Sequence, residues 1–215
     1  MRTAVLALAL LAAAPLSAQV AAGHDHDAAV QGAPLPAGWS VRLDRPDANR
    51  ANLRFVAERG GFHFTGGPAA ILYRDADTGA SSIRARFAQL RAPSHPEAYG
   101  LFVGGKNLQA AGQEYLYFIV RGDGKYMVKH RAGAEVHTIS DWTASPALAA
   151  ANPAGRAVNM LEIRVRADGA HLVANGRELT VVPGSWVGTA GLRINHNLDV
   201  RVDQLRVARG GSGPR

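Results

Sequence analysis

Apolar and polar residues alternate along most of this chain, and the alternation predicts β-strands. The run Tyr115–Arg121, Tyr-Leu-Tyr-Phe-Ile-Val-Arg, is rich in aromatic and β-branched residues, as buried strands are. Asp123-Gly124 follows it, and apolar and polar residues then alternate over Lys125–Arg131. Asp-Gly between two such runs is a strong hairpin signal, because a two-residue turn of this kind needs positive φ at both central residues. We therefore predict a β-hairpin across these residues.

The same device recurs further along the chain. Leu161–Arg166 leads through Asp168-Gly169 into His171–Ala174, and Asn175-Gly176 then leads into Glu178–Val182. Two more hairpins that share their middle strand are the prediction.

Nine other short runs have strand composition and are bounded by turn residues. They are Ser40–Leu43, Leu53–Val56, Phe62–Phe64, Ala70–Tyr73, Ser82–Leu90, Gly100–Gly104, Glu135–Ile139, Gly191–His196 and Val200–Val207.

No long segment shows helical periodicity, and Pro146 and Pro153 limit the Ala-rich stretch Ala144–Ala154 to one turn of helix within a loop. About a dozen short strands at this spacing are typical of a two-sheet antiparallel sandwich.

The two ends of the chain differ from this pattern. Arg2 followed by the apolar run Ala4–Leu16 and small residues up to Ala22 predicts a signal peptide over residues 1–22. The alternative, a retained membrane anchor, is disfavoured because a bilayer span needs about 20 apolar residues. Residues 23–37 are a flexible lead-in and 209–215 a flexible tail, which leaves residues 38–208 as one β-sandwich domain. We expect a periplasmic or secreted protein without a transmembrane segment after signal removal.

Composition narrows the function classes. The absence of Cys excludes disulfides, a thiolate nucleophile, a Cys metal site and a lipid-anchored lipoprotein. The net charge is +7, or +6 without the signal peptide. Many cations stand at alternate strand positions, as at Arg84 and Arg86, with no Lys/Arg run interleaved with aromatics, so we expect no nucleic-acid partner.

Several segments resemble the concanavalin A-like lectin/glucanase superfamily, and most closely the 3-keto-disaccharide hydrolase-like family of bacterial secreted domains. These segments are Ser82-Ile-Arg-Ala-Arg-Phe, Tyr99-Gly-Leu-Phe-Val-Gly-Gly, Leu161-Glu-Ile-Arg-Val, Leu172-Val-Ala-Asn-Gly, Gly191-Leu-Arg-Ile-Asn-His and Val202-Asp-Gln-Leu-Arg-Val207. The resemblance implies an all-β jelly-roll sandwich. It also implies either a carbohydrate-type ligand or a hydrolase or lyase that acts on oxidised glucosides with the help of a metal and a histidine.

Carboxylates offer little for ordinary glycoside hydrolysis, which uses a pair of them. The glucanase branch carries a Glu-x-Asp-x-x-Glu string, and this chain has none. Asp75 and Asp77 have the right spacing but lie in a turn composition; half of a calcium loop and a plain turn are both open. For the segment Gly23–Asp27, Gly-His-Asp-His-Asp, weak binding of a transition metal after signal cleavage is the alternative to a plain soluble tail, which is favoured. No cofactor is required, and a divalent metal, calcium or another, is allowed.

Histidine offers the other acid–base candidates. His95 and Glu97 lie together on a loop before a predicted strand, and His196 ends another, next to Asn195. If the chain is an enzyme, His95, Glu97 and His196 are its catalytic candidates. For each histidine alone, a plain surface role is the alternative, and no His–His metal spacing occurs within the domain.

The strand Tyr115–Arg121 also predicts a binding surface. Tyr115, Tyr117 and Arg121 share the strand face opposite Leu116, Phe118 and Val120, and aromatic rings with fixed polar groups are typical of ligand sites. Lys129, Tyr99 and Asn195 are the other candidate ligand contacts.

We therefore expect a domain that binds a carbohydrate or other small polar ligand on one sheet face. A glycoside-processing enzyme and a structural cell-envelope module are the alternatives, and no oligomeric state is predicted.

Overall fold

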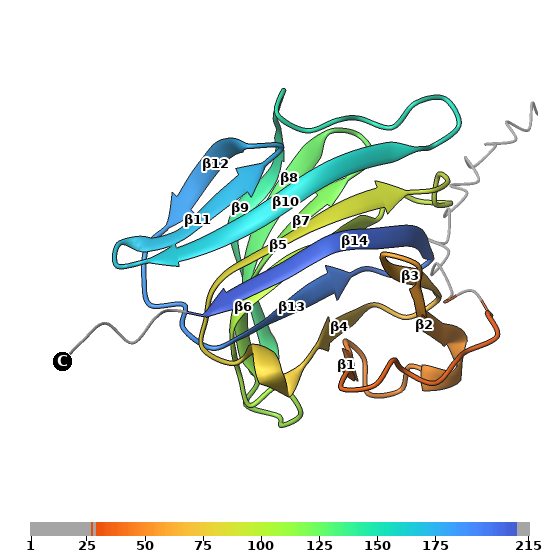
Figure 1. Cartoon of the computed structure of the whole chain (residues 1–215), viewed down its shortest axis with the longest axis horizontal. Coiled ribbons are helices and arrows are strands. Elements are labelled where there is room, and N and C mark those ends of the chain that lie inside the picture. Colours follow the sequence, from red (N-terminus) through yellow and green to blue (C-terminus); the bar gives the residue numbers. More distant parts are fainter. Residues whose placement is uncertain (1–26, 28, 210–215) are drawn as a thin grey trace, which may run out of the picture.

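The computed structural model describes residues 27 and 29–209, and within them every regular element except two short 3₁₀ turns is a β-strand. Two antiparallel sheets of seven strands form two stacked layers (Figure 1). The predicted signal peptide, most of Gly23–Asp27 and the end of the tail lie outside the described residues. Among the described residues, no helix is long and apolar enough to cross a membrane.

Sheet A has the strand order β1-β4-β13-β6-β7-β8-β9. Its strands are β1 (Ser40–Leu43), β4 (Ala70–Tyr73), β13 (Thr189–Ile194), β6 (Ala98–Lys106), β7 (Glu114–Arg121), β8 (Lys125–Ala132) and β9 (Glu135–Ala144).

Sheet B has the order β12-β11-β10-β5-β14-β3-β2. Its strands are β12 (Arg177–Val182), β11 (Gly169–Ala174), β10 (Ala157–Arg166), β5 (Ala80–Gln89), β14 (Leu198–Arg209), β3 (Gly61–Gly66) and β2 (Leu53–Glu58). The 3₁₀ turns are Arg50–Asn52 and Asp75–Asp77.

Every run predicted as a strand coincides with a strand, except that Leu90, Asn195 and His196 lie beyond the ends of β5 and β13. The alternation that predicts these runs also fits one buried and one outer sheet face. The prediction of a helical turn within Ala144–Ala154 is wrong. After β9 that stretch is a loop with isolated turns, such as the one closed by Leu148 N–H donating to Ser145 O at 3.1 Å.

The predicted hairpins form, but their turns differ in detail. Asn175 and Gly176 have φ of 49° and 82°, so this turn has positive φ at both central residues, as predicted. Arg121 pairs with Lys125, so the β7–β8 loop has three residues, and only Gly124 has positive φ, at 76°. One extra residue places the left-handed conformation on glycine alone, which spares Asp123 the steric strain of that region.

The core lies between the two sheets. Leu116, Phe118 and Val120 of β7 are fully buried there, as the alternation predicts, together with Phe87 of β5 and Ile163 of β10. Each such side chain contributes roughly 1.5–3 kcal/mol through removal from water. The sequence contains no Cys, so no disulfide supports this core.

Candidate functional site

Glu97 and His196 meet at one end of sheet A. Glu97 immediately precedes β6 and His196 follows β13; these strands are neighbours, and Asn195 N–H donates to Ala98 O at 2.9 Å. The pairing brings His196 Nε2 to 2.7 Å from Glu97 Oε1. Both side chains are largely buried. Two of the three residues predicted as catalytic candidates are therefore in direct contact.

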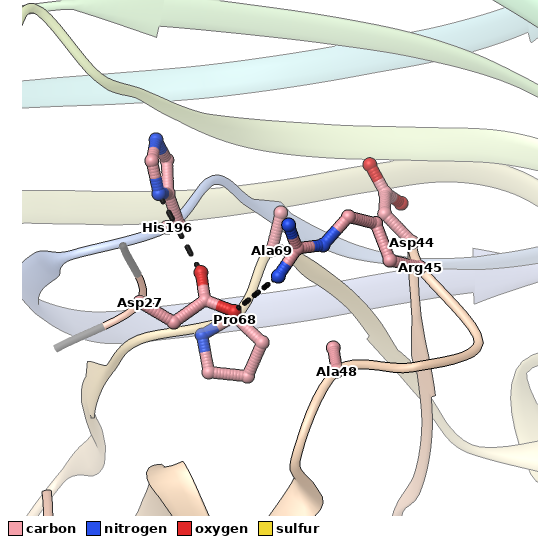
Figure 2. A pocket seen from close by; sticks show the side chains of 7 residues that line it. All are labelled: Asp27, Asp44, Arg45, Ala48, Pro68, Ala69 and His196. Atoms are coloured by element: carbon pink, nitrogen blue, oxygen red, sulfur yellow. Dashed lines mark hydrogen bonds and ion pairs between the residues drawn. The ribbon is translucent and has the colours of Figure 1, made fainter. Parts of the chain in front are cut away.

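Asp27 lies on the other side of the His196 ring. His196 Nδ1 is 3.6 Å from Asp27 Oδ1, and Asp27 Oδ2 is 2.9 Å from Arg45 Nη2, so Asp27 stands between the imidazole and the guanidinium (Figure 2). Carboxylates near both ring nitrogens fix the orientation of the imidazole. These residues line a hollow of about 220 Å³ with Asp44, Ala48, Pro68 and Ala69.

A second hollow, of about 340 Å³, is lined by Glu97. We call it the Glu97 hollow. His95 lines it together with Glu97, so the predicted local pair shares one cavity wall. Asp123 of the β7–β8 turn faces the same space. The remaining lining residues are Gln89, Ala92, Pro93, Ser94, Pro96, Gly122 and Ala151.

Gln89, the last residue of β5, is a wall residue that the sequence did not point to. Its side chain is 2% exposed, and its Nε2 donates to Gly155 O at 2.7 Å. Within the described part of the chain its Oε1 is buried and has no hydrogen-bond partner. A buried acceptor without a donor costs about 1–3 kcal/mol, so a hydroxyl donor that reached it would gain that free energy back.

Asp123 brings a negative charge to the lining of this hollow. Its two carboxylate oxygens lie 2.8 Å from Arg121 Nε and 2.7 Å from Arg121 Nη2, and Lys125 Nζ is 3.7 Å away. Partial burial alone would raise the pKa of Asp123, but the hydrogen bond and charge of Arg121, helped by Lys125, lower it below its ordinary value. The side chains of Arg121 and Asp123 thus pair with each other at the turn.

The tyrosines of β7 lie on the predicted face but do not meet solvent. Tyr115 and Tyr117 point away from the core, yet they are only 1% and 6% exposed. Phe102 packs against Tyr115 with ring centroids 5.4 Å apart, and the two tyrosine rings lie 5.6 Å from each other. Together with Trp142 of β9 they form an apolar layer on the outside of sheet A. The prediction of an exposed tyrosine platform is therefore wrong.

A buried ion pair covers Tyr117 on the outer face of sheet A. Arg193 of β13 lies over the Tyr117 ring, with its guanidinium carbon 5.3 Å from the ring centroid, and it binds both carboxylate oxygens of Asp44. Burial alone would lower the pKa of Arg193, but Asp44 raises it above its ordinary value. An arginine at an alternate strand position is typical of a solvent-facing site, so the sequence predicted neither the burial of Arg193 nor its pairing with Asp44.

The other predicted ligand contacts have mixed positions. Tyr99 points into the core, where its ring stacks on Phe87 at 5.2 Å, so it is not part of the outer face. Tyr99 pairs with Val120, whose side chain points into the core, whereas Tyr117 on the same strand as Val120 points to the outer face. Lys129 pairs with Tyr117 and does lie on the outer face. Asn195 stands beside His196, and its Oδ1 is buried without a partner among the described residues.

Asp75 and Asp77 form a 3₁₀ turn, and Arg74 accounts for the buried one. Arg74 Nε lies 2.8 Å from Asp77 Oδ2, and Nη2 lies 3.1 Å from Oδ1. Across the described residues there is no cluster of three or more His, Asp or Glu side chains placed to hold a metal ion.

Comparison with known proteins shows which solved structures share this fold. Neither a model of a known protein family nor a curated protein matches the sequence. Among solved structures, the carbohydrate-binding module CBM66 from Bacillus subtilis matches with a TM-score of 0.56 at 10% identity, over 78% of this chain and 93% of that chain. The Bacillus licheniformis beta-glucanase matches with a TM-score of 0.58 at 8% identity, over 81% of this chain and 94% of that one.

A GH16 protein of the Bacteroides ovatus mixed linkage glucan PUL, in complex with a G4G4G3G product, matches with a TM-score of 0.53 at 6% identity, over 79% of this chain and 94% of that one. At such identities the likeness concerns the fold. The matched proteins are concanavalin A-like jelly-roll proteins, and this chain has their fold: an all-β, two-sheet antiparallel jelly-roll sandwich.

Proposed function

We propose that the chain binds a carbohydrate-type ligand in the Glu97 hollow. One observation carries the proposal: the wall of this cavity holds Gln89, a nearly fully buried side chain whose Oε1 has no hydrogen-bond donor among the described residues. Ligand sites combine a concave shape with a few fixed polar groups, and their volumes begin at about 300 Å³. The hollow, at about 340 Å³, has room for a single sugar unit.

The polar groups suit sugar hydroxyls. Glu97, Asp123 and Gln89 Oε1 are all hydrogen-bond acceptors, and each is held by a neighbour: His196, Arg121 and the Gly155 carbonyl respectively. A hydroxyl group donates to such acceptors, and pre-ordered acceptors lose little entropy when the ligand arrives. The fold shared with a carbohydrate-binding module and a beta-glucanase supports the same ligand class.

Affinity electrophoresis of the mature domain through gels that contain neutral glucans tests this binding. Glu97→Gln and Gln89→Leu should each abolish the retardation, because one weakens an acceptor and the other removes it. Asp47→Asn is the matched control, since the Asp47 side chain is 81% exposed and lies outside the hollow. Retardation that survives both hollow variants would refute the site.

The second candidate is a glycoside-processing enzyme, similar to 3-keto-disaccharide hydrolases or lyases. The contact of 2.7 Å between Glu97 and His196 favours it, because a carboxylate that holds an imidazole at its edge can take up and release a proton. Glu97, which lines the hollow together with His95, would act as acid or base, His196 would orient it, and His95 would contact the substrate.

Turnover separates the enzyme from the binding module. Purified protein is incubated with 3-keto-glucosides, with and without added divalent metal and with chelator. Loss of substrate that His196→Gln suppresses supports catalysis, while unchanged substrate under every condition rejects it and leaves binding intact.

We also propose that the chain acts outside the cytoplasm. The apolar run Ala4–Leu16 after Arg2, followed by small residues, supports a cleavable signal. Cell fractionation with N-terminal mass determination checks this: a mature form that begins after Ala22 in the periplasm or medium agrees with it, and an intact cytoplasmic chain contradicts it.

A further inference from the structure

A row of cations runs along the outer face of β7 and β8. Arg121 pairs with Lys125, Tyr117 with Lys129 and Tyr115 with Arg131, so these cations share the face of the two tyrosines. We call Arg121, Lys125, Lys129 and Arg131 the cationic stripe. The six residue-to-residue steps from Lys125 to Arg131 extend about 20 Å along β8 at the usual rise of a strand.

The stripe has few carboxylates of its own. Asp123 serves both Arg121 and Lys125, and the carboxylate nearest to Arg131 is Asp44, 3.9 Å away, which already binds Arg193. Lys129 has no ion-pair partner among the described residues. Four cations thus share one dedicated carboxylate, and the uncompensated positive potential attracts anions.

An aromatic ring borders the stripe. Trp142 of β9 packs on the apolar layer, is partly exposed, and has the guanidinium carbon of Arg121 at 4.2 Å from its ring centroid. The guanidinium lies over the face of the ring, so a cation and an aromatic side chain stand together at this end of the stripe.

The stripe and the Glu97 hollow are continuous. Asp123 lines the hollow and is bound by Arg121, the first member of the stripe. Arg121 also pairs with Ala98, the residue after Glu97. A chain-like ligand that left the hollow over the β7–β8 turn would pass directly onto Arg121 and Trp142.

We propose that the ligand is an acidic carbohydrate chain, with one sugar unit in the Glu97 hollow and its carboxylate or sulfate groups along the cationic stripe. This inference rests on the proposed function and names the class of its ligand. The carboxylates of Glu97 and Asp123 accept sugar hydroxyls but repel phosphates, which favours a glycan with spaced acidic groups over the uniformly charged backbone of a nucleic acid.

Affinity electrophoresis with polygalacturonate, dextran sulfate and neutral dextran tests the charge requirement. Retardation should be stronger with a polyanion than with dextran, and it should fall as salt rises. Preference for polygalacturonate identifies carboxylates as the recognised group, and preference for dextran sulfate identifies sulfates. Lys129→Gln should weaken polyanion binding about fivefold, the upper range for one partly exposed charge pair. Arg84→Gln removes the same charge from an exposed position on sheet B and should change nothing.

The outcomes separate this inference from the proposed function. Equal loss with Lys129→Gln and Arg84→Gln would mean nonspecific charge attraction and would overturn the acidic ligand. Equal affinity for duplex DNA would overturn it as well. Neutral dextran bound as well as the polyanions, with sensitivity to Gln89→Leu, would overturn only the acidic class and support the hollow. Polyanion binding that Gln89→Leu and Glu97→Gln leave unchanged would overturn the hollow as part of the site.

Discussion

Both carboxylate oxygens of Asp44 lie 2.5 Å from the two terminal nitrogens of Arg193, although the two residues are 149 positions apart in the sequence. Asp44 follows β1 near the edge of sheet A, and Arg193 stands on β13, two strands further in. The pair therefore ties the first strand of the chain across the outer face of the sheet, above the buried Tyr117.

Removal of one partner should destabilise the fold. Asp44→Asn leaves the Arg193 guanidinium buried without a counter-charge, which costs about 3 kcal/mol. Urea denaturation followed by fluorescence measures the loss, and Asp47→Asn, at an exposed position, should leave the free energy of unfolding unchanged. Equal stability of the Asp44→Asn variant and the wild type would show that Arg193 is not electrostatically dependent on Asp44.

The same pair should make stability depend on acid. Burial alone would raise the pKa of Asp44, but the charge and hydrogen bonds of Arg193, helped by Arg131 and Arg42, lower it below its ordinary value. A carboxyl with a lowered folded-state pKa stabilises fully above its unfolded pKa, near 3.9, and loses this contribution as pH falls through the folded value. The stability difference between wild type and Asp44→Asn should therefore shrink below about pH 4. A difference that stays constant down to pH 2 would contradict this.

Tyr117 should behave as a packing residue. Tyr117→Ala opens a cavity in the apolar layer and should cost about 3–5 kcal/mol, the range for loss of a large aromatic side chain. Tyr117→Phe keeps the ring against Tyr115 and beneath Arg193 and should cost far less. Thermal denaturation compares the two. A small effect of Tyr117→Ala together with lost glycan binding would instead indicate a ligand platform.

His171 should favour the fold below neutral pH. Its ring nitrogens lie 2.9 Å from Asp168 and 2.9 Å from Glu178, and these hydrogen bonds, that of Asp168 first, raise the pKa of His171 above its ordinary value. A raised folded-state pKa gives stability that is complete below the unfolded pKa, near 6.5, and that disappears as pH rises through the folded value. The difference in free energy of unfolding between wild type and His171→Gln should therefore decrease as pH rises from the unfolded pKa through the folded pKa of His171.

NMR titration of the His171 ring checks the cause directly. Glu178→Gln should move its pKa downward, because a neutral amide no longer favours the imidazolium. An unchanged titration midpoint in this variant would show that Glu178 does not contribute.

Two glycines should differ sharply on substitution. A Cβ at Gly191 would lie 2.3 Å from Leu72 O, inside the sheet, so Gly191→Ala must displace backbone and should cost about 3 kcal/mol. Gly176 has open space around it but a φ of 82°, so Gly176→Ala should cost only about 1 kcal/mol of backbone strain. Chemical denaturation ranks the two, and the reverse order would contradict the close packing of β13 on β4.

The strands could be predicted because their signal is local. Leu116, Phe118 and Val120 alternate with Tyr115, Tyr117 and Ile119, and a period of two assigns each set to one face whatever the rest of the chain does. The local signal gave the wrong turn at Asp123-Gly124, because the dipeptide does not determine the length of the loop. Alternation also did not show that Tyr99 belongs to the core. Which way its side chain points is set by its pairing with Val120, a core residue of the neighbouring strand.

The candidate site was only partly readable. His95 and Glu97 are neighbours in the sequence, so their shared loop was evident. The approach of Glu97 to His196 follows from the pairing of β6 with β13, which no local pattern encodes. Gln89 and Trp142 carry no sequence signal at all.

By itself, the sequence determined the strands, their buried faces, and the residue types that a polar site could use. It did so because side-chain periodicity and turn chemistry act over a few residues. Tertiary structure alone decided that an outer apolar layer and the Asp44–Arg193 pair bury Tyr115 and Tyr117, and that Glu97 and His196 share a contact. Those outcomes depend on the order of the strands and on which long side chains lie over a sheet. The contacts that produce them form between segments that are distant in the chain, so no local pattern encodes their free energy.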